Sequence, residues 1–161
     1  MLFRSVKEGL EHHSTLAFME DRTRRLDTIQ NTFDARNKRI SVLYLDDNDF
    51  NLMVTQEIFG AKGNRVWTFS DPFKALEHLN QSAVDVVLTD LNMPEMSGAE
   101  FADEVRQLLG DKCPPILGLT ASDLNEVSDE VRTHFDSVYT KPMSVQAVMQ
   151  FLEQKAQTLC V

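Results

Sequence analysis

The sequence has few cysteines and no long apolar run, and both absences narrow the class of protein. The two cysteines, Cys113 and Cys160, lie far apart, without a Cys-x-x-Cys or neighbouring histidine pattern. This argues against a structural zinc site or a dithiol redox centre. No apolar stretch approaches the about 18 residues that indicate a bilayer-spanning helix, and the N-terminus lacks the pattern of a secretory signal. We therefore expect a cytoplasmic protein without membrane contact.

Phosphate-binding patterns and excess positive charge are also missing. No Walker-type or Gly-x-Gly-x-x-Gly motif occurs, which disfavours nucleotide hydrolysis. The net charge is −9, and residues 1–39 carry eight Lys or Arg against six Asp or Glu, so residues 40–161 carry −11. A phosphate backbone repels so acidic a segment, and we expect no nucleic-acid binding.

Short apolar runs alternate with helix-start signals along most of the chain. Residues 40–45, 84–89, 115–119 and 136–140 are rich in β-branched and apolar side chains, as in buried parallel strands. Helix starts are indicated by Asp71-Pro72, by Ser97 with Glu100, and by Ser144. Five β-α repeats predict an α/β fold: a doubly wound, flavodoxin-like, five-stranded parallel sheet with strand order 2-1-3-4-5.

Polar residues follow these predicted strands at the ends where ligands bind in open α/β sheets. They are Asp46-Asp47, Asp90, Thr120 and Lys141. Three aspartates in one crevice raise one another's pKa or bind a cation, and an all-oxygen ligand set favours Mg²⁺. An ammonium and a hydroxyl beside that metal suit a trianionic phosphoryl group, with one aspartate as the nucleophile.

Each of these residues has a simpler explanation when it is taken alone. Asp46, Asp47 and Asp90 could cap helices, Thr120 could be an ordinary strand residue, and Lys141 could be a solvated loop lysine. Their joint placement at one edge of one predicted sheet favours the functional interpretation.

Residues 40–161 resemble the receiver domain of two-component response regulators. The resemblance rests on Asp46-Asp47, on the segment DLNMPEMSG that begins at Asp90, on Thr120-Ala121 and on Lys141-Pro142. It implies that Asp90 takes a phosphoryl group from a phosphohistidine on a histidine kinase or a histidine phosphotransfer protein.

The resemblance also implies a ligand set and a role for the neighbouring residues. Asp47, Asp90 and the backbone carbonyl of Asn92 would ligate Mg²⁺ directly, while Asp46 acts through bound water. Lys141 would contact the phosphoryl oxygens together with Thr120. Mg²⁺-dependent catalysis would be limited to the protein's own phosphorylation and dephosphorylation.

Three further positions are assigned by the same resemblance. Asn92 and Ser122, each two residues past a key site residue, resemble positions that tune the lifetime of the phospho-aspartate. The bond between Lys141 and Pro142 resembles a cis peptide that aims the ammonium at the site.

The chain departs from the family pattern at the switch position. Receivers often carry an aromatic residue three positions before the lysine, and Val138 stands there instead. Tyr139 comes next in the chain and is predicted to point to the opposite face of the strand. Because Thr120 is retained, we expect phosphorylation to shift the loop after Thr120 and the helix beyond that loop.

Partner surfaces can be assigned from the resemblance. A protein effector would dock on the fourth helix, the fifth strand and the fifth helix, here residues 123–134, 136–140 and 144–159. Residues 1–39 form a helical extension or linker, and a partial heptad at Met19, Leu26 and Phe33 predicts a helix over residues 15–37. A homodimerisation helix, a partner-docking helix, a signalling linker, a helix packed on its own domain and a partly disordered tail all remain open for it.

Two functions remain open at this point. One is a phosphoacceptor in a phosphorelay, either free-standing or as the C-terminal receiver of a hybrid histidine kinase. The other is an interaction module that uses the receiver fold without phosphorylation. The complete set of site residues favours the first.

Overall fold

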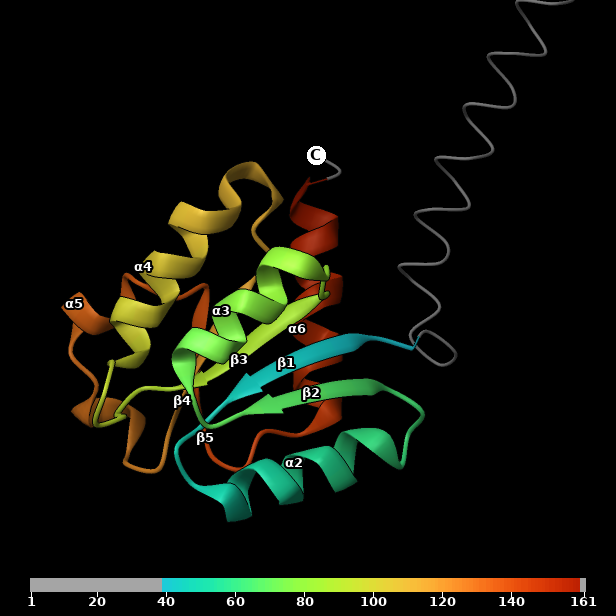
Figure 1. Ribbon diagram of the computed structural model, residues 1–161, viewed down its shortest axis with the longest axis horizontal. Coiled ribbons are helices and arrows are strands. Elements are labelled where there is room, and N and C mark those ends of the chain that lie inside the picture. The colour runs from blue at the N-terminus through green and yellow to red at the C-terminus, as the bar shows by residue number, and fades with distance from the viewer. Residues whose placement is uncertain (1–38, 160–161) are drawn as a thin grey trace, which may run out of the picture. The chain divides into compact units, whose positions relative to one another are not determined.

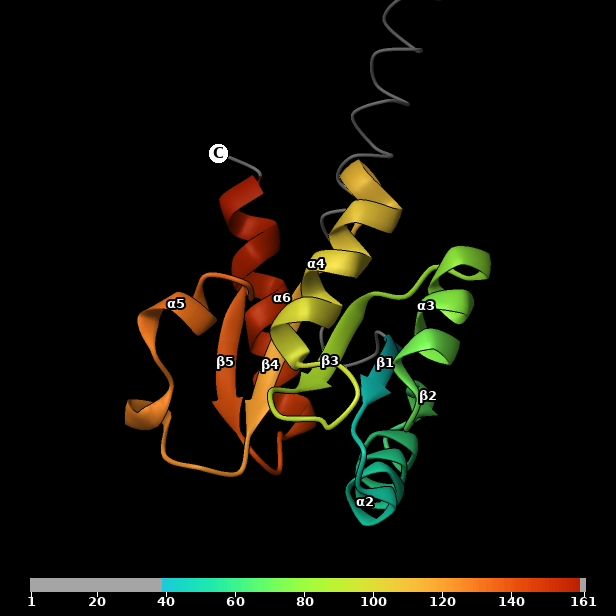
Figure 2. The same ribbon diagram turned by 60° about the vertical axis from the view of Figure 1, so that its left-hand side comes forward.

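A computed structural model of the protein describes residues 39–159 (Figure 1). Five strands form one sheet: β1 Ser41–Leu45, β2 Arg65–Phe69, β3 Val86–Asp90, β4 Ile116–Thr120 and β5 Ser137–Thr140. All neighbouring strands are parallel and their order is β2-β1-β3-β4-β5 (Figure 2). The predicted flavodoxin-like fold and strand order are thereby confirmed.

Each strand is followed by a helix. The helices are α2 Asp49–Gly60, α3 Pro72–Gln81, α4 Gly98–Leu109, α5 Asp129–Arg132 and α6 Val145–Leu159, with 3-10 turns η1 Gly110–Lys112 and η2 Leu124–Glu126.

The helices begin where the sequence indicated. Asp71 accepts the backbone N–H of Phe73 at 2.9 Å, with Pro72 in the first turn of α3. Ser97 and Glu100 form a reciprocal capping box at the start of α4, with hydrogen bonds of 3.2 and 2.8 Å. Side-chain caps satisfy backbone N–H groups that have no partner within a helix, so the turns after β2 and β3 are fixed locally.

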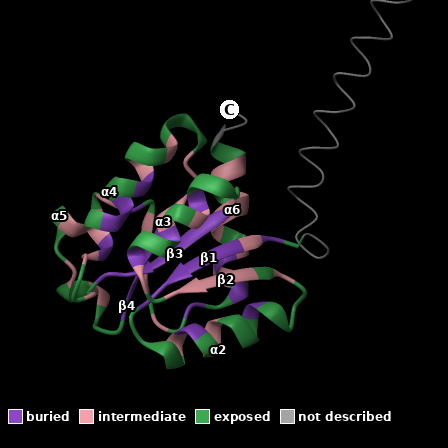
Figure 3. Cartoon of the chain, in the orientation of Figure 1, coloured by how far each residue is buried: buried purple, intermediate pink, exposed green. Residues whose placement is uncertain are grey.

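Alternate strand residues supply the two faces of the sheet. Leu43, Leu45 and Val87 belong to one buried cluster with apolar residues of α3 and α4. Val42 and Tyr44 point to the other face, where α2 packs (Figure 1). Burial is concentrated in β1, β3 and β4, whereas Asp49 and Phe50 at the start of α2 are exposed (Figure 3).

The predicted fourth helix over residues 123–134 is wrong in its extent. The structure has the 3-10 turn η2 and the single-turn helix α5 instead. Asp123 caps η2 at Asn125, Ser128 caps α5 at Val131, and the Arg132 guanidinium donates to the backbone carbonyls of residues 124 and 127. Side chains thus form hydrogen bonds with backbone N–H and C=O groups that would bond to each other in a continuous helix.

Among residues 39–159, no helix is long and apolar enough to cross a bilayer. Residues 1–38, with the predicted helix and nearly all of the predicted extension, lie outside the described residues, so their assigned roles stay predictions.

Candidate functional site

The polar residues predicted to converge do meet at the carboxyl edge of the sheet. Asp46 follows β1 and Asp90 ends β3, and both are buried, whereas Asp47 is exposed. Carboxylate oxygens of these three residues all lie within 4.8 Å of one another. Parallel strands bring these chain segments together because their carboxyl ends share one edge.

Lys141 follows the edge strand β5 and bridges two of the carboxylates. Its Nζ lies 2.7 Å from Oδ2 of Asp46 and 3.1 Å from Oδ1 of Asp90. Burial opposes the charge of Lys141, but the hydrogen bonds to Asp46 and Asp90 outweigh burial and raise the pKa of the ammonium. The ammonium therefore stays charged and partly neutralises the acidic cluster.

The two buried aspartates respond to this environment in opposite directions. Burial disfavours the Asp46 carboxylate, but hydrogen bonds from Lys141 and Tyr44 outweigh burial, and the pKa of Asp46 lies below its usual value. At Asp90 burial prevails over the hydrogen bond from Lys141, and the pKa of Asp90 is raised. Asp46 is thus the stable anion of the pair, and Asp90 is a carboxylate whose charge is poorly compensated.

Asp46 is held by residues that sequence reasoning did not assign to the site. Its Oδ2 accepts the Tyr44 hydroxyl at 2.5 Å and the Asn51 amide at 3.1 Å, and its Oδ1 accepts the Asn48 backbone N–H at 2.9 Å. Backbone pairing of β1 with β2 continues through Asp46 N–H to the Phe69 carbonyl at 3.1 Å, so residues 44 and 46 share a face of the strand. The alternation of side chains along a strand, with a period of two residues, could have indicated from the sequence that Tyr44 lies on the same face as Asp46.

The loop after Asp90 packs closely against its own backbone. The Asn92 N–H donates to Oδ1 of Asp90 at 3.4 Å, and the Gly98 N–H donates to the Leu91 carbonyl at 2.9 Å. A Cβ atom at Gly98 would lie only 2.3 Å from the carbonyl oxygen of Asp90. Gly98 therefore permits the close approach that places Asp90, a role that the sequence motif contained but did not explain.

Thr120 lies at the same edge but is not hydrogen-bonded to the acidic cluster through its side chain. Its hydroxyl accepts the Ser122 N–H at 3.0 Å, and its carbonyl accepts the Lys141 N–H at 2.8 Å. Thr120, Ser122 and Asn92 line one cavity of about 320 Å³ beside Asp90. The two predicted lifetime positions thus face the space next to the phosphoacceptor candidate.

Strand β5 carries the departure from the family pattern. Val138 is buried and packs in the cluster with Leu43 and Phe135, whereas Tyr139 is only half-buried. The peptide bond between Lys141 and Pro142 is cis, which is the geometry that the resemblance implied.

The donor set of this site fits a magnesium ion. All ligand candidates are oxygens, which suits a hard divalent cation, and the exposed Asp47 opens the cluster to solvent. Asp47, Asp90 and the Asn92 carbonyl are the candidate direct ligands.

The family model of the response regulator receiver domain matches residues 42–153. The chain belongs to this family. Curated relatives are sensor kinases: the sensor histidine kinase RcsC of Salmonella typhi is 33% identical over 79% of this chain, and the aerobic respiration control sensor protein ArcB of Escherichia coli is 28% identical over 71%. The matches cover only 13% and 15% of those proteins, so the receiver domain corresponds to a small part of each.

Solved receiver domains have the same fold. The chemotaxis protein CheY4 of Vibrio cholerae shares 28% identity, with a TM-score of 0.62 over 73% of this chain and 98% of its own. The receiver domain of the sensor histidine kinase PA1611 from Pseudomonas aeruginosa, whose structure has a magnesium ion in the active-site cleft, has a TM-score of 0.63 at 21% identity. It covers 74% of this chain and 99% of its own. The chain is thus a receiver domain of two-component phosphorelay signalling.

Proposed function

We propose that this receiver domain accepts a phosphoryl group from a phosphohistidine onto Asp90. The observation that carries this proposal is the cluster itself: Asp46, Asp47 and Asp90 converge within 4.8 Å, and Lys141 contacts both buried carboxylates. Three carboxylates this close together repel one another, which is unfavourable unless the cluster binds a cation. The arrangement therefore favours a site that works with a metal ion.

The chemistry is a displacement at phosphorus. An Asp90 carboxylate oxygen forms the new P–O bond while the P–N bond of the donor breaks, and the leaving imidazole takes up a proton. The burial that raises the pKa of Asp90 leaves its carboxylate poorly solvated, which favours attack once the charge of the donor is compensated.

Positive charge for the transferred group comes from this chain and from the metal. Lys141 Nζ is 3.1 Å from Asp90 Oδ1. A small movement of the ammonium would therefore bring it to an oxygen of a phosphoryl group bound to Oδ1. Asp47, Asp90 and the Asn92 carbonyl would hold Mg²⁺, with Asp46 acting through water. When bound, the ion would compensate the charge of the phosphoryl oxygens.

Thr120, Asn92 and Ser122 would control the response to the transfer and the lifetime of the product. The Thr120 hydroxyl would turn to the phosphoryl group and pull the loop that begins at Ala121 with it. This movement of the loop would shift η2 and α5. Asn92 and Ser122 line the cavity beside Asp90 and would set how readily water reaches the phospho-aspartate.

The partners would be a histidine kinase or a histidine phosphotransfer protein and a downstream protein. The sensor-kinase relatives support a role as the receiver of a hybrid kinase, with a free-standing response regulator as the alternative. A protein effector would use α5, β5 and the first turn of α6. The donor would approach over the first turns of α2, where Phe50 and Met53 are 65% and 56% exposed beside Asp46-Asp47.

Incubation with acetyl phosphate, followed by intact-mass measurement, tests the proposal. We expect a base-labile gain of one phosphoryl group that requires Mg²⁺ and disappears in Asp90→Ala. No gain from acetyl phosphate or from a phosphohistidine protein, together with no Mg²⁺ binding, would point to the interaction module without phosphorylation.

A further inference from the structure

We propose that Tyr44 is a positioning residue of the acidic site, whose hydroxyl fixes the Asp46 carboxylate and thereby sets the affinity for Mg²⁺. The proposal rests on the proposed function, because it concerns the same metal site. Tyr44 is not a ligand in this scheme and acts through Asp46.

The Tyr44 side chain is almost fully buried, with 1% of its surface exposed, and it is the next-to-last residue of β1. A buried tyrosine hydroxyl needs a hydrogen-bond partner, and many such groups donate to a nearby backbone carbonyl. Here the partner is Asp46 Oδ2, at 2.5 Å. Thr55 of α2 lies beside the Tyr44 hydroxyl in the lining of the same cavity, so a second element borders the hydroxyl.

The hydrogen bonds of Asp46 are distributed unevenly over its two oxygens. Oδ2 accepts from Tyr44, Lys141 and Asn51, whereas Oδ1 accepts only the Asn48 N–H among the described residues. A carboxylate offers about four acceptor positions, two on each oxygen. The open position of Asp46 is therefore on Oδ1, and that oxygen is available to a metal-bound water.

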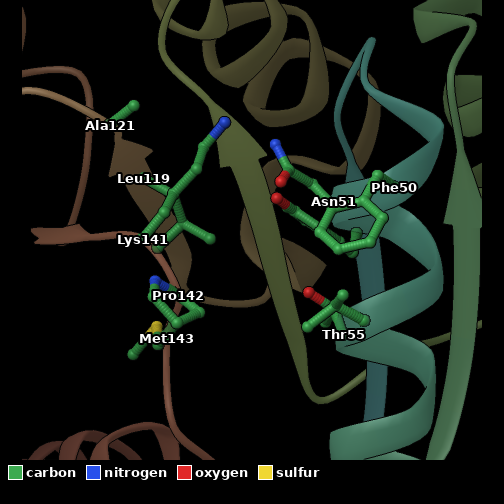
Figure 4. Close-up of a pocket in the computed structure, with 10 residues that line it drawn as sticks. Phe50, Asn51, Thr55, Leu119, Ala121, Lys141, Pro142 and Met143 are labelled. Atoms are coloured by element: carbon green, nitrogen blue, oxygen red, sulfur yellow. The ribbon is translucent and has the colours of Figure 1, made fainter.

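Tyr44 is the most rigid of the three donors to Oδ2. Lys141 is a long side chain that also contacts Asp90, and Asn51 lies in the first turn of α2 at the edge of a cavity of about 330 Å³. Figure 4 shows Asn51 and Lys141 reaching from opposite walls of this cavity toward each other, with Thr55 further along α2 on the same wall as Asn51. The aromatic ring of Tyr44 is fixed by the core, so its hydroxyl cannot follow a rotation of the carboxylate.

The rigidity matters most when Lys141 moves. In the proposed reaction Lys141 turns from Asp46 to a phosphoryl oxygen, which removes one donor from Oδ2. Tyr44 and Asn51 then remain to keep Oδ2 in place and Oδ1 facing the metal side. Groups that orient a direct metal ligand commonly change metal affinity by about 10- to 100-fold when they are removed. Tyr44 is one step further from the ion, because Asp46 acts through water, so we expect an effect near the lower end of that range.

Isothermal titration calorimetry with MgCl₂ tests the inference on the wild type, Tyr44→Phe, Thr55→Val and the control Tyr139→Phe. We expect the dissociation constant for Mg²⁺ to rise about tenfold or more in Tyr44→Phe, to rise less in Thr55→Val, and to stay unchanged in Tyr139→Phe. Thr55→Val also serves as the second variant if Tyr44→Phe fails to fold, because it removes a polar neighbour of the Tyr44 hydroxyl without touching the cluster.

The Mg²⁺ dependence of phosphorylation by acetyl phosphate separates positioning from general damage. We expect Tyr44→Phe to need more Mg²⁺ for half-maximal rate while its rate at saturating Mg²⁺ stays near that of the wild type. A loss of rate that Mg²⁺ does not restore, or an unchanged dissociation constant in Tyr44→Phe, would overturn the inference. Absence of Mg²⁺ binding in the wild type would instead contradict the metal site of the proposed function.

Discussion

Lys141 and Asp46 are 95 positions apart in the sequence and form a partly buried ion pair of 2.7 Å, in which Asp46 is completely shielded from solvent. Asp90 shares the same ammonium at a longer distance of 3.1 Å. The unequal sharing agrees with the opposite pKa directions of the two aspartates, lowered at Asp46 and raised at Asp90. Their charges therefore have opposite effects on the free energy of unfolding.

The stability of the metal-free protein tests this asymmetry. At neutral pH and in EDTA, Asp46→Asn should lower the free energy of unfolding by about 2 kcal/mol, because a charged hydrogen-bond acceptor is lost. Asp90→Asn should raise it, because the poorly compensated charge is removed. Thermal melts followed by circular dichroism would show shifts of opposite sign.

The pH dependence is set by the same directions. Asp46 has a lowered pKa, so its contribution is present above the usual Asp range and is lost as the pH falls through the lowered value. The deficit of Asp46→Asn relative to the wild type should therefore shrink in acid. Two substitutions that change stability in the same direction at pH 7 would contradict this account of the cluster.

The exposed member of the cluster should matter for the metal rather than for the fold. Asp47→Asn should weaken Mg²⁺ binding at least tenfold in calorimetry, because a direct oxygen ligand loses its charge, and should leave the melting temperature nearly unchanged. Asp49→Asn, which removes another exposed carboxylate two residues away, is the matched control. If both substitutions weakened Mg²⁺ binding equally, the ion would be attracted by the overall negative charge of this region and not by Asp47 as a ligand.

Gly98 should tolerate no side chain. Gly98→Ala places a Cβ atom 2.3 Å from the Asp90 carbonyl oxygen, so we expect a loss of about 1–3 kcal/mol in the free energy of unfolding and slower phosphorylation. Gly60→Ala is the control, because a Cβ there meets nothing within 4 Å, and its stability should change by no more than about 1 kcal/mol. Urea denaturation of both variants decides the point.

The switch should depend on Thr120 and not on the aromatic residue of β5. Thr120→Val should abolish most of the chemical-shift changes that phosphorylation causes in residues 121–135, because the hydroxyl that moves to the phosphoryl group is gone. Tyr139→Ala should leave them largely intact, since Val138 occupies the core position on the other face of the strand. Complete loss of these NMR changes in Tyr139→Ala would refute the expectation.

Donor docking over α2 predicts a difference between two phosphodonors. Phe50→Ser should slow phosphotransfer from a phosphohistidine protein at least fivefold, an effect of about 1 kcal/mol, because an exposed apolar contact is lost. It should leave the rate with acetyl phosphate unchanged. Phe73→Ser is a close control, since Phe73 is 62% exposed at the start of α3. A similar loss in both variants would place the donor elsewhere.

Much of the fold was predictable because its signals are local. Strand composition and caps such as Asp71 and Ser97 act within a few residues, and the strand order is constrained by the handedness of the connections. Asp46, Asp47, Asp90 and Lys141 could be grouped because parallel strands place their carboxyl ends together. This grouping needs no knowledge of side-chain conformation.

Other features required packing that periodicity does not contain. The spacing of apolar residues in α4 predicts that Leu108 faces the sheet together with Phe101 and Val105, but Leu108 is 43% exposed. Periodicity shows which face of a helix is apolar, but not how far along the helix that face stays in contact with the sheet. The role of Gly98 depends on a contact between backbones that the sequence does not display. The cytoplasmic location and the role of residues 1–39 stay predictions.

Borohydride trapping identifies the phosphorylated residue chemically. The protein is phosphorylated in Mg²⁺ by a phosphohistidine protein or acetyl phosphate and then treated with borohydride, which reduces an aspartyl phosphate to homoserine. Peptide mass mapping shows which residue was converted. We expect homoserine at Asp90 alone, and none when Mg²⁺ is omitted. Homoserine at Asp46, Asp47 or another aspartate, with Asp90 intact, would show that Asp90 is not the phosphoacceptor.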